Sequence, residues 1–528
     1  MLGARLAGIG MEGAVAESDP DAGALRDMQG PLIATRPAGA WAPGSRRARA
    51  ASLVLVVAAT LLTYWPTVRN GFLQIAFDDA IVVDTAEIRG LDAPHLAAMA
   101  TRFNHAHYAP LTMLSLALDY RIWGLDPFGY HLTNIGLHAL TAALVCVFLW
   151  PIMPSLAAAT LAALVFAVHP LQMESVSLVI QRKTVLSGAL CFAALIAYQA
   201  WRRGGRRRHY AAAVITFVAA ALAKPVVVTL PVLLWLYEYT FIGGRLRWRD
   251  KVPFVAIAAA CAAAALAAHA AVDATPAWHG GDPLTHLVMS ARVTAEYLSA
   301  TFLPLALSPT YYYRRALAFE PLNLLALAAL SVLGVGLVLR RHRFPWTFFC
   351  AAWFAIGLLP ESNVVQLRAD RFLYLPLLGA AIWFAVGLER LPALGVAPAR
   401  AARLAARAAG AALVAVFALV TYGSAGVWRS DVTAWTRVAE RHPWSATAFL
   451  LLGHAYLAAD DPTGAEAAYL RAVDLKPDLA EAHLALARLY LARGEQSAAD
   501  LHAERFVELA PESPDGPALL TAMRRGDS

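Results

Sequence analysis

The sequence predicts an all-α fold: a polytopic membrane domain followed by a C-terminal domain of helical repeats. Three observations lead to this prediction. The 528 residues are 59% hydrophobic and only 15% charged, whereas soluble globular domains are about 45–50% apolar and about 25% charged. Eleven apolar runs approach the length of a helix that spans a bilayer. Prolines recur at a spacing of 34 residues near the C-terminus.

Residues 1–50 are rich in Gly, Ala and Pro and have no sustained hydrophobic periodicity. This composition is typical of disorder, so we expect a disordered cytoplasmic tail. The first long apolar run begins near Ala51. A cleavable signal peptide begins much closer to the N-terminus and is therefore not expected.

Residues 51–428 form the predicted membrane domain. A spanning helix needs about 20 predominantly apolar residues, within a range of about 17–25. Runs near that length predict about 11 transmembrane helices, at 51–67, 131–150, 155–170, 183–201, 210–223, 226–242, 252–272, 321–340, 345–360, 372–389 and 408–427.

The basic residues predict how these helices are oriented. The net charge of +7 and the pI of about 9.3 could indicate nucleic-acid binding. However, the Lys and Arg residues cluster in short loops beside apolar runs, which is a topology signal, so we expect no nucleic-acid partner. If these loops are cytoplasmic, the eleven helices alternate without conflict, provided that 284–307 is an interfacial helix. The segments then placed outside are the 68–130 loop, the 170–182 turn, the 273–320 loop and everything after about 428.

Residues 429–528 carry the repeat. Pro443, Pro477 and Pro511 are 34 residues apart, which is the period of the tetratricopeptide repeat, a pair of antiparallel helices. Small residues such as Gly453 and Ala465 would let the two helices approach, and large ones such as Tyr469 would fill the gap. An α-solenoid usually needs three or more repeats, so we expect this short array to lean on the membrane domain.

The first outer loop, 68–130, is about 60 residues long, and loops of that length are usually functional. It opens with the adjacent carboxylates Asp78 and Asp79. Such a pair could do acid–base work on an acceptor hydroxyl, or could hold a divalent metal. The alternative is a solvated turn, which Asp also favours, and spacing alone favours this alternative.

Other polar residues of this loop allow two interpretations. His105 and His107 could ligate a metal, but no further ligand completes a site, which favours ordinary hydrogen bonding. At the start of the next apolar run, polar residues lie on roughly one helical face: Tyr130, His131, Asn134 and His138. They could face a wet cavity or form hydrogen bonds between helices.

Basic residues occur in the predicted outer turns, against the positive-inside pattern. Arg182 and Lys183 follow Glu174 in the second turn, and Lys224 and Arg371 lie in later ones. An anionic lipid phosphate could bind them, because unpaired charges near the membrane are costly. The alternatives are an Arg182–Glu174 surface pair, a snorkelling Lys224, and an internal network between Arg371 and its neighbour Asp370.

Five segments together suggest a family. They read FDDAIVV, YAPLTMLSLALDYRIWGLDPFGYHLTNIGLH, HPLQMESVSLVIQRKTVLSG, LAKPVVVTLPVLL and ADRFLYLPLLG. In this order they resemble bacterial relatives of the transmembrane and tetratricopeptide-repeat O-mannosyltransferases, which are similar to protein O-mannosyltransferases and the wider GT-C glycosyltransferases. The resemblance extends from about residue 51 to the repeats.

The resemblance implies a GT-C-like fold with an active site on the outer face, a polyprenyl-phosphate sugar donor and transfer with inversion. Asp78 and Asp79 would be the catalytic residues, with Asp78 as the base and Asp79 supporting it or helping to position the acceptor. The donor phosphate would be bound by Arg182, Lys183, Lys224 and Arg371, and supporting positions would be Glu174, His131 and Tyr108. This chain departs from many relatives at Thr184, Ala109 and Pro225, where they often carry acidic or basic residues.

The predicted function is therefore transfer of a sugar, with mannose as a candidate, to a protein or glycan acceptor presented by the repeats. A divalent metal remains an option. The predicted location is the inner membrane of a bacterium, with the N-terminus in the cytoplasm and the repeats outside. The alternative is a non-catalytic scaffold for envelope assembly. A transporter is a weaker reading because the chain shows no evident inverted repeat.

Overall fold

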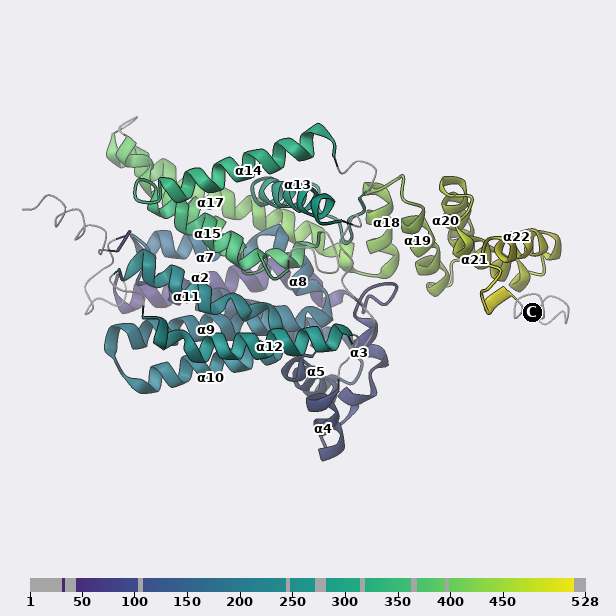
Figure 1. Cartoon of the computed structure of the whole chain (residues 1–528), viewed down its shortest axis with the longest axis horizontal. Helices are drawn as coiled ribbons and strands as arrows, with labels where there is room; N and C mark the ends of the chain where they lie inside the picture. The colour runs from purple at the N-terminus through teal and green to yellow at the C-terminus, as the bar shows by residue number, and fades with distance from the viewer. Residues whose placement is uncertain are drawn as a thin grey trace, which may run out of the picture.

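A computed structural model describes residues 31–33, 44–102, 108–243, 247–270, 282–313, 319–361, 368–394 and 398–516. Throughout these residues the regular elements are helices, without a strand, which confirms the predicted all-α class. Two parts follow one another along the longest axis: a body of long, roughly parallel helices, and a smaller array of short helices that ends near the C-terminus (Figure 1).

Every predicted apolar run coincides with a helix of the body. The first helix begins at Arg46, five residues ahead of the predicted start, because Ser45 caps its N-terminus through the amide of Ala48. The eleven helices are α2 (Arg46–Tyr64), α6 (Pro127–Leu149), α7 (Leu156–Val168), α9 (Arg182–Gly204), α10 (Arg207–Ala223), α11 (Leu230–Phe241), α12 (Val252–Ala270), α14 (Pro321–Leu339), α15 (Pro345–Leu358), α16 (Leu377–Arg390) and α17 (Ala399–Ser424).

Five helical stretches of the described residues are long and apolar enough to cross a membrane. They are Arg46–Arg69, Pro127–Leu149, Val179–Gly204, Pro321–Leu339 and Ala399–Trp428. A sixth is added if α7 and the segment Pro170–Ser177, which meet at a bend of 51°, are counted as one span. The remaining helices of the body are shorter or less apolar, so the count of about 11 spans stays a prediction.

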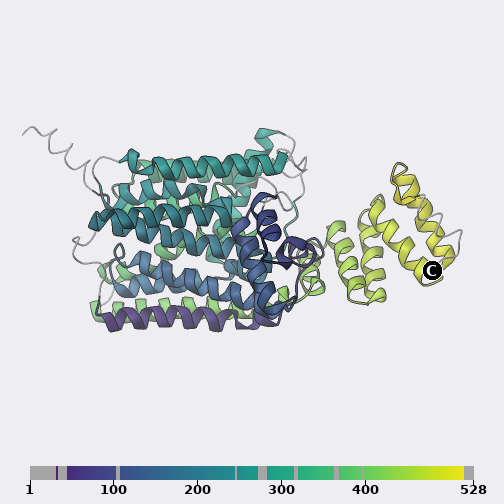
Figure 2. The ribbon, with the colours of Figure 1, turned by 90° about the horizontal axis from the view of Figure 1, so that it is seen from below.

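The predicted first outer loop is largely helical. It contains α3 (Ala80–Asp84), η2 (Ala86–Arg89), α4 (Ala93–Thr101) and α5 (Pro110–Trp123), and it leads into α6. The N-termini of α4, α5 and α6 each carry proline in the first turn, where its missing N–H is not needed. Figures 1 and 2 both show these helices at the end of the body that meets the repeats.

The predicted second outer turn is buried rather than exposed. After α7 the chain forms the short helices η3 (Pro170–Gln172), α8 (Met173–Ser177) and η4 (Val179–Gln181) before α9 begins. All residues from His169 to Thr184 are buried. The predicted alternative of a surface pair in this turn is therefore wrong, since the segment packs between helices. The segment 284–307, expected to be interfacial, begins as a further helix, α13 (Pro283–Phe302).

The C-terminal array begins with α18 (Asp431–Arg441) and continues as two helical hairpins. The first is α19 (Ala446–Ala458) with α20 (Pro462–Leu475), and the second is α21 (Ala480–Ala492) with α22 (Gln496–Leu509). All four boundaries of the second hairpin follow those of the first by 34 residues, as the sequence period predicts. Assignment to the tetratricopeptide family itself stays a prediction.

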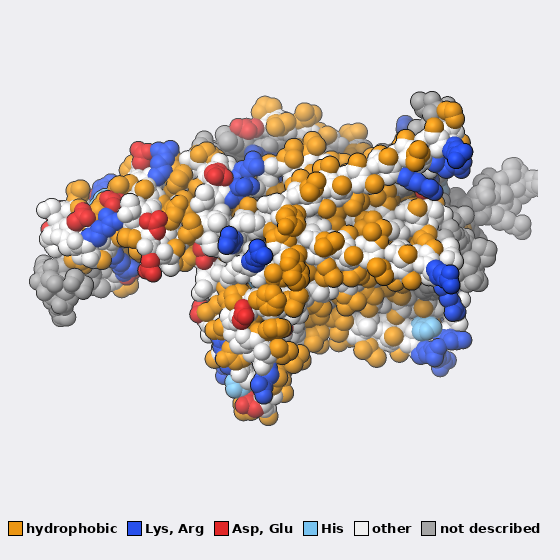
Figure 3. Space-filling view, turned by 180° about the vertical axis from the view of Figure 1, so that it is seen from behind, with side chains coloured by type: hydrophobic (Ala, Val, Ile, Leu, Met, Phe, Trp, Pro, Cys, Tyr) orange, Lys and Arg blue, Asp and Glu red, His pale blue; other side chains and the backbone are white. Residues whose placement is uncertain are grey.

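Charges are unevenly distributed over the surface. Hydrophobic side chains dominate the side of the body, whereas Lys and Arg gather at the end of the body away from the repeats (Figure 3). Exposed residues near that end of their helices include Arg46, Arg47, Arg206, Arg207, Arg208, Arg340, Arg343, Arg390, Arg400, Arg403 and Arg407. The apolar band and the basic end have the pattern of a helical membrane protein.

Candidate functional site

Six charged side chains from separate parts of the sequence meet at the repeat-facing end of the body. Electrostatic interactions link Lys183 to Asp78, Lys224, Arg371 and Glu361, and link Arg371 to Asp78, Glu361 and Glu174. We call these six residues the charged cluster. Four of the predicted site residues, Asp78, Lys183, Lys224 and Arg371, thus come together, along with the predicted supporting residue Glu174.

Asp78 is the member of the charged cluster that is open to a reactant. Its side chain is 47% exposed, and its Oδ2 lies 3.5 Å from Nζ of Lys183, which is itself mostly buried in the first turn of α9. The distance is longer than that of a direct hydrogen bond, and almost half of the side chain is open to solvent. This environment agrees with the role of base that the resemblance implies.

Lys224 lies between α10 and the short helix η5 (Pro225–Thr229). Its ammonium group forms an ion pair with Glu361, just beyond α15, and donates to Oγ1 of Thr184 at 3.2 Å. Lys224 therefore points into the protein, against the snorkelling alternative. Sequence reasoning missed Glu361, because it lies 137 residues from Lys224 in an ordinary loop and no spacing rule connects them.

Arg371 lies in the short helix η8 (Asp370–Leu373) that precedes α16. Its side chain forms an ion pair with the buried carboxylate of Glu174, and its backbone amide donates to the same carboxylate at 2.9 Å. Glu174 thus holds Arg371 at two points. The predicted alternative partner, Asp370, instead accepts from the hydroxyl of Tyr311 at 3.0 Å and lies 3.7 Å from Arg368.

Arg182 is placed differently from the prediction. Its side chain is fully buried, and its guanidinium donates to four oxygens: Oδ2 of Asp119 (2.5 Å), Oδ1 of Asn134 (2.5 Å), Oγ of Ser115 (2.8 Å) and the carbonyl of Tyr130 (3.0 Å). Four of its five N–H donors are thus engaged within the protein, and the side chain is buried. These contacts favour a structural role over the predicted contact with the donor phosphate: Arg182 fastens α9 to α5 and α6.

Asp79 is also placed differently from the prediction. It is completely buried, and its carboxylate accepts from the amides of Ile180 (2.8 Å) and Leu73 (3.3 Å). Burial raises the pKa of Asp79 to about 7, although both amide donors lower it. Because both carboxylate oxygens accept from these amides, the contacts of Asp79 fit a positioning residue that ties the loop of Asp78 to η4.

The other predicted polar residues take part in packing. Nε2 of His131 lies 3.4 Å from the carbonyl oxygen of Gly71. Tyr108, just before α5, donates to the carbonyl of Ala100 in α4 at 2.9 Å. His138 contacts Tyr374 and Ala167, each at 2.9 Å. These contacts favour hydrogen bonding between elements over a wet cavity for this face of α6. His105 and His107 lie outside the described residues.

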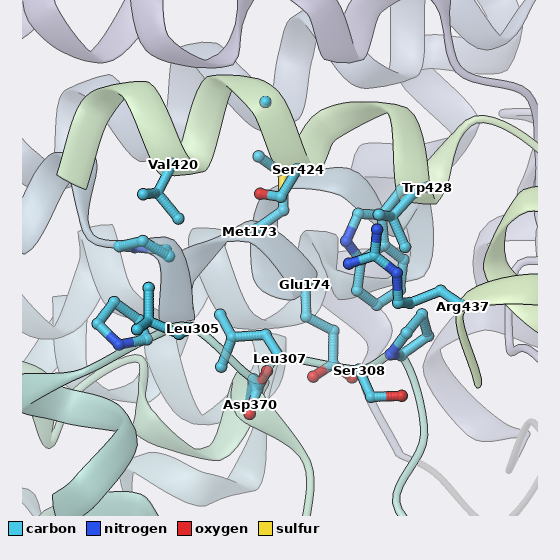
Figure 4. Close-up of a pocket in the computed structure, with 15 residues that line it drawn as sticks. Met173, Glu174, Leu305, Leu307, Ser308, Asp370, Val420, Ser424, Trp428 and Arg437 are labelled. Carbon is cyan, nitrogen blue, oxygen red and sulfur yellow. The ribbon is translucent and has the colours of Figure 1, made fainter. Parts of the chain in front are cut away.

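A cavity of about 240 Å³ lies beside the charged cluster, between the body and α18. In Figure 4, Glu174 points into it from one side while Arg437 of α18 and Trp428 border the other. Asp370 and Ser308 line it as well, and apolar side chains such as Val420 complete the wall. Burial raises the pKa of Asp370 to about 7, against the lowering effect of Arg368. The cavity thus lies between α18, which contributes Arg437, and Glu174, which holds Arg371.

The cluster can therefore offer an exposed carboxylate beside three cations that converge from α9, the α10–η5 junction and η8. This set suits an anionic group and a proton transfer at one place. In the part of the chain that the structure describes, no group of three or more His, Cys, Asp or Glu side chains could hold a metal ion. Because His105 and His107 lie outside the described residues, a divalent metal stays a prediction.

Parts of the chain are similar to animal proteins of known name. It is 32% identical over 145 residues to protein O-mannosyl-transferase Tmtc1 of Drosophila melanogaster, which covers 27% of this chain and 16% of that protein. It is 30% identical over 158 residues to protein O-mannosyl-transferase TMTC3 of Mus musculus, with coverage of 28% and 16%. It is 37% identical over 95 residues to protein O-mannosyl-transferase tmtc2 of Xenopus laevis, with coverage of 18% and 11%.

The chain thus spans about a sixth, or less, of the length of these relatives. No protein-family model matches the chain, and no solved structure matches it. The relatives bear the name of the family that the outer-loop motifs resemble, and so they support that resemblance.

Proposed function

We propose that the chain is a membrane glycosyltransferase that moves a sugar, with mannose as the first candidate, from a polyprenyl phosphate to a hydroxyl of a protein acceptor. One observation carries the proposal: the exposed carboxylate of Asp78 lies 3.5 Å from Lys183 at the point where three cations converge. The names of the animal relatives supply the candidate sugar and acceptor class.

The reaction that suits this geometry is a single displacement. Asp78 accepts the proton of the acceptor hydroxyl while the hydroxyl oxygen attacks the anomeric carbon of the donor. The bond between that carbon and the phosphate oxygen breaks, and the polyprenyl phosphate leaves with the electron pair. Attack opposite the leaving group inverts the configuration at the anomeric carbon. The proton then passes from Asp78 to bulk water.

The leaving phosphate gains negative charge, so cations fixed near it would lower the barrier. Lys183, Lys224 and Arg371 are proposed for this role, whereas the buried network of Arg182 favours a structural one. Glu174 and Glu361 form ion pairs with Arg371 and Lys224 and hold them in place. A bound phosphate would share these cations with the two carboxylates.

The repeats are proposed to bring the acceptor to the site. Stacked helical hairpins present extended surfaces that bind peptides and proteins. Their first helix, α18, contributes Arg437 to the cavity that borders Glu174. An acceptor segment held by the repeats would therefore be close to the charged cluster.

The distribution of charge gives the proposed orientation. Lys and Arg gather at the end of the body opposite to the repeats (Figure 3), and cytoplasmic loops are the ones that carry such an excess. The charged cluster, the outer-loop helices and the repeats are therefore proposed to lie outside the cytoplasm, with Arg46 at the cytoplasmic start of α2.

Sugar transfer in membranes tests the function. Membranes containing the wild-type chain or Asp78→Asn would receive a panel of radiolabelled polyprenyl-phosphate sugars and an extract of extracytoplasmic proteins. We expect transfer from one donor, and a loss of about 10²-fold or more in kcat with Asp78→Asn, the scale seen when an acid–base group is removed. The amide keeps the size of the side chain but cannot take the proton.

The matched control is Asp84→Asn, an exposed aspartate at the end of α3 on the same loop. It should transfer as the wild type does at equal protein level. If Asp78→Asn restores growth or envelope integrity in a strain lacking the gene, the proposed enzymatic function would be contradicted. That outcome would favour the non-catalytic scaffold.

A further inference from the structure

We infer that α18, the first helix of the repeat array, holds the loop that carries Asp78 in its active conformation. Asp431 and Trp435 of α18 would be positioning residues for Asp78. The inference rests on the proposed function, because it concerns the placement of the proposed base. The repeat end of the chain would then help to position the base, in addition to binding the acceptor.

The loop from Asn70 to Asp79 makes few hydrogen bonds of its own. Asp431, the first residue of α18, accepts from the amides of Gln74 (3.1 Å) and Ile75 (3.0 Å) through its carboxylate. The indole N–H of Trp435 donates to the carbonyl of Ile75 at 2.9 Å. One turn of α18 thus bonds the amides of two consecutive loop residues and the carbonyl of the second.

Aromatic packing continues this contact toward the base. The ring of Phe77, the residue before Asp78, lies between Trp428 and Trp435, with centroids 6.3 and 5.4 Å away. On the other side of Asp78, the buried Asp79 is fixed by Ile180. The base therefore sits between two anchored neighbours, one anchored to α18 and the other to η4.

The backbone between these anchors has an unusual shape. Ala76 has φ of 56°, in the left-handed region that non-glycine residues rarely adopt. Such a conformation persists only where surrounding contacts impose it. Here the imposing contacts are those of Ile75 and Phe77 with α18, so loosening α18 would let the loop relax and carry Asp78 away from Lys183.

Two variants test the inference in the full-length protein. Asp431→Ala removes the carboxylate that accepts from the loop, and Trp435→Phe removes the indole N–H while keeping an aromatic ring. Both should lower kcat for transfer by about tenfold or more, because small misplacements of a reacting group cost up to about 10²-fold. The KM for the donor should stay within about twofold, since the cations are untouched. Asp431→Asn, which keeps one acceptor oxygen, should fall between Asp431→Ala and the wild type.

Hydrogen exchange supplies a readout that does not depend on activity. The amides of Gln74 and Ile75 should exchange faster in Asp431→Ala than in the wild type, because Gln74 is exposed and Asp431 is its acceptor. The matched control is Asp282→Ala, which removes an exposed aspartate cap at the start of α13, outside both the loop and the repeats. It should leave kcat and loop exchange unchanged.

Each outcome separates the inference from the proposed function. Inactive Asp78→Asn with unchanged kcat in both Asp431→Ala and Trp435→Phe would leave the function standing and overturn the inference. Unchanged loop exchange in Asp431→Ala would overturn it as well. Full transfer by Asp78→Asn would contradict the proposed function, and with it the inference that α18 positions the base.

Discussion

Asp78 and Asp79 are neighbours in sequence but have opposite environments. The side chain of Asp78 is 47% exposed beside Lys183, whereas Asp79 is fully buried and accepts two amide hydrogen bonds. Arg182 and Lys183 form a second such pair. Successive residues of a helix point about 100° apart, so Arg182 faces α5 and α6 while Lys183 faces Asp78. In both pairs the sequence predicted that a site was present, but it could not tell which member faces it.

Asp79 gives a pH-dependent prediction. Folded Asp79 holds its proton up to about pH 7, whereas an unfolded aspartate loses it near pH 3.8. The folded state therefore binds more protons between these values, and the free energy of unfolding falls as the pH rises through this window. Asp79→Asn removes the titrating group, but it also removes one of the two oxygens that accept from the amides of Ile180 and Leu73. The variant should therefore be less stable than the wild type near pH 4, and the difference should shrink as the pH rises toward 8, because only the wild type loses stability in that window.

Thermal unfolding of the detergent-solubilised protein at several pH values measures this difference. Asp84→Asn, at an exposed position of the same loop, is the control and should run parallel to the wild type. A constant offset between Asp79→Asn and the wild type at every pH would show that Asp79 does not titrate in this range.

The buried partner of Arg182 gives a second prediction at this scale. Asp119→Ala would leave the fully buried guanidinium without its ion pair, and breaking a buried pair in this way costs about 3–5 kcal/mol. Asp119→Asn keeps an oxygen that can accept from Arg182 and should cost less. The fraction of folded protein recovered by size-exclusion chromatography ranks the two variants, and equal recovery would argue against the network.

At the scale of elements, hydrophobic length and the 34-residue period predicted the helices well. Each of the eleven apolar runs coincides with a helix, and the two C-terminal hairpins follow each other at the predicted period. The burial of the segment from His169 to Thr184 was missed, because its charged residues Glu174 and Arg182 pair with distant residues that no local pattern reveals. Glu361 was missed for the same reason, since it pairs with a lysine from another part of the chain.

The first hairpin depends on close approach at one glycine. A Cβ added to Gly453 of α19 would lie 2.2 Å from the ring of Tyr469 on α20. We expect Gly453→Ala to separate the two helices and to destabilise the hairpin by about 1–3 kcal/mol, the usual cost of overpacking. Protease digestion of the repeats, followed by mass spectrometry, would show earlier cleavage.

The control for this variant is Gly136→Ala in α6, where an added Cβ meets nothing within 4 Å. That change should stabilise its helix by up to about 1 kcal/mol, because alanine is the better helix former. Equal protease resistance of Gly453→Ala and the wild type would mean that Tyr469 can move aside without cost.

At the scale of the whole molecule, the repeats and the body meet through α18, the cavity and the loop of Asp78. We propose that this joint divides the C-terminal part into two functional pieces. The helix α18 would belong with the loop of Asp78, and the two hairpins with the proposed acceptor. The sequence predicted that the short array would lean on the membrane domain, and the contacts of Asp431 and Trp435 show where it does so.

Two truncations test this division. A chain ending after Trp444 keeps α18 and loses both hairpins, whereas a chain ending after Trp428 loses α18 as well. We expect the first to keep a kcat near that of the wild type with a raised KM for a protein acceptor. The second should lose about tenfold or more in kcat, since its loop has no partner for Gln74 and Ile75. Equal kcat values in the two chains would contradict the division.

The contact between Gln74 and Asp431 joins residues that are 357 positions apart, and this separation has a consequence for biosynthesis. Ribosomes add about 5–20 residues per second, so α18 emerges about 20–70 s after the loop that it shapes. During that interval the nascent body would enter the bilayer with the segment around Asp78 still unformed. If the chain acts as proposed, activity would appear only when synthesis has passed α18, and no half-made chain would consume the proposed lipid-linked donor.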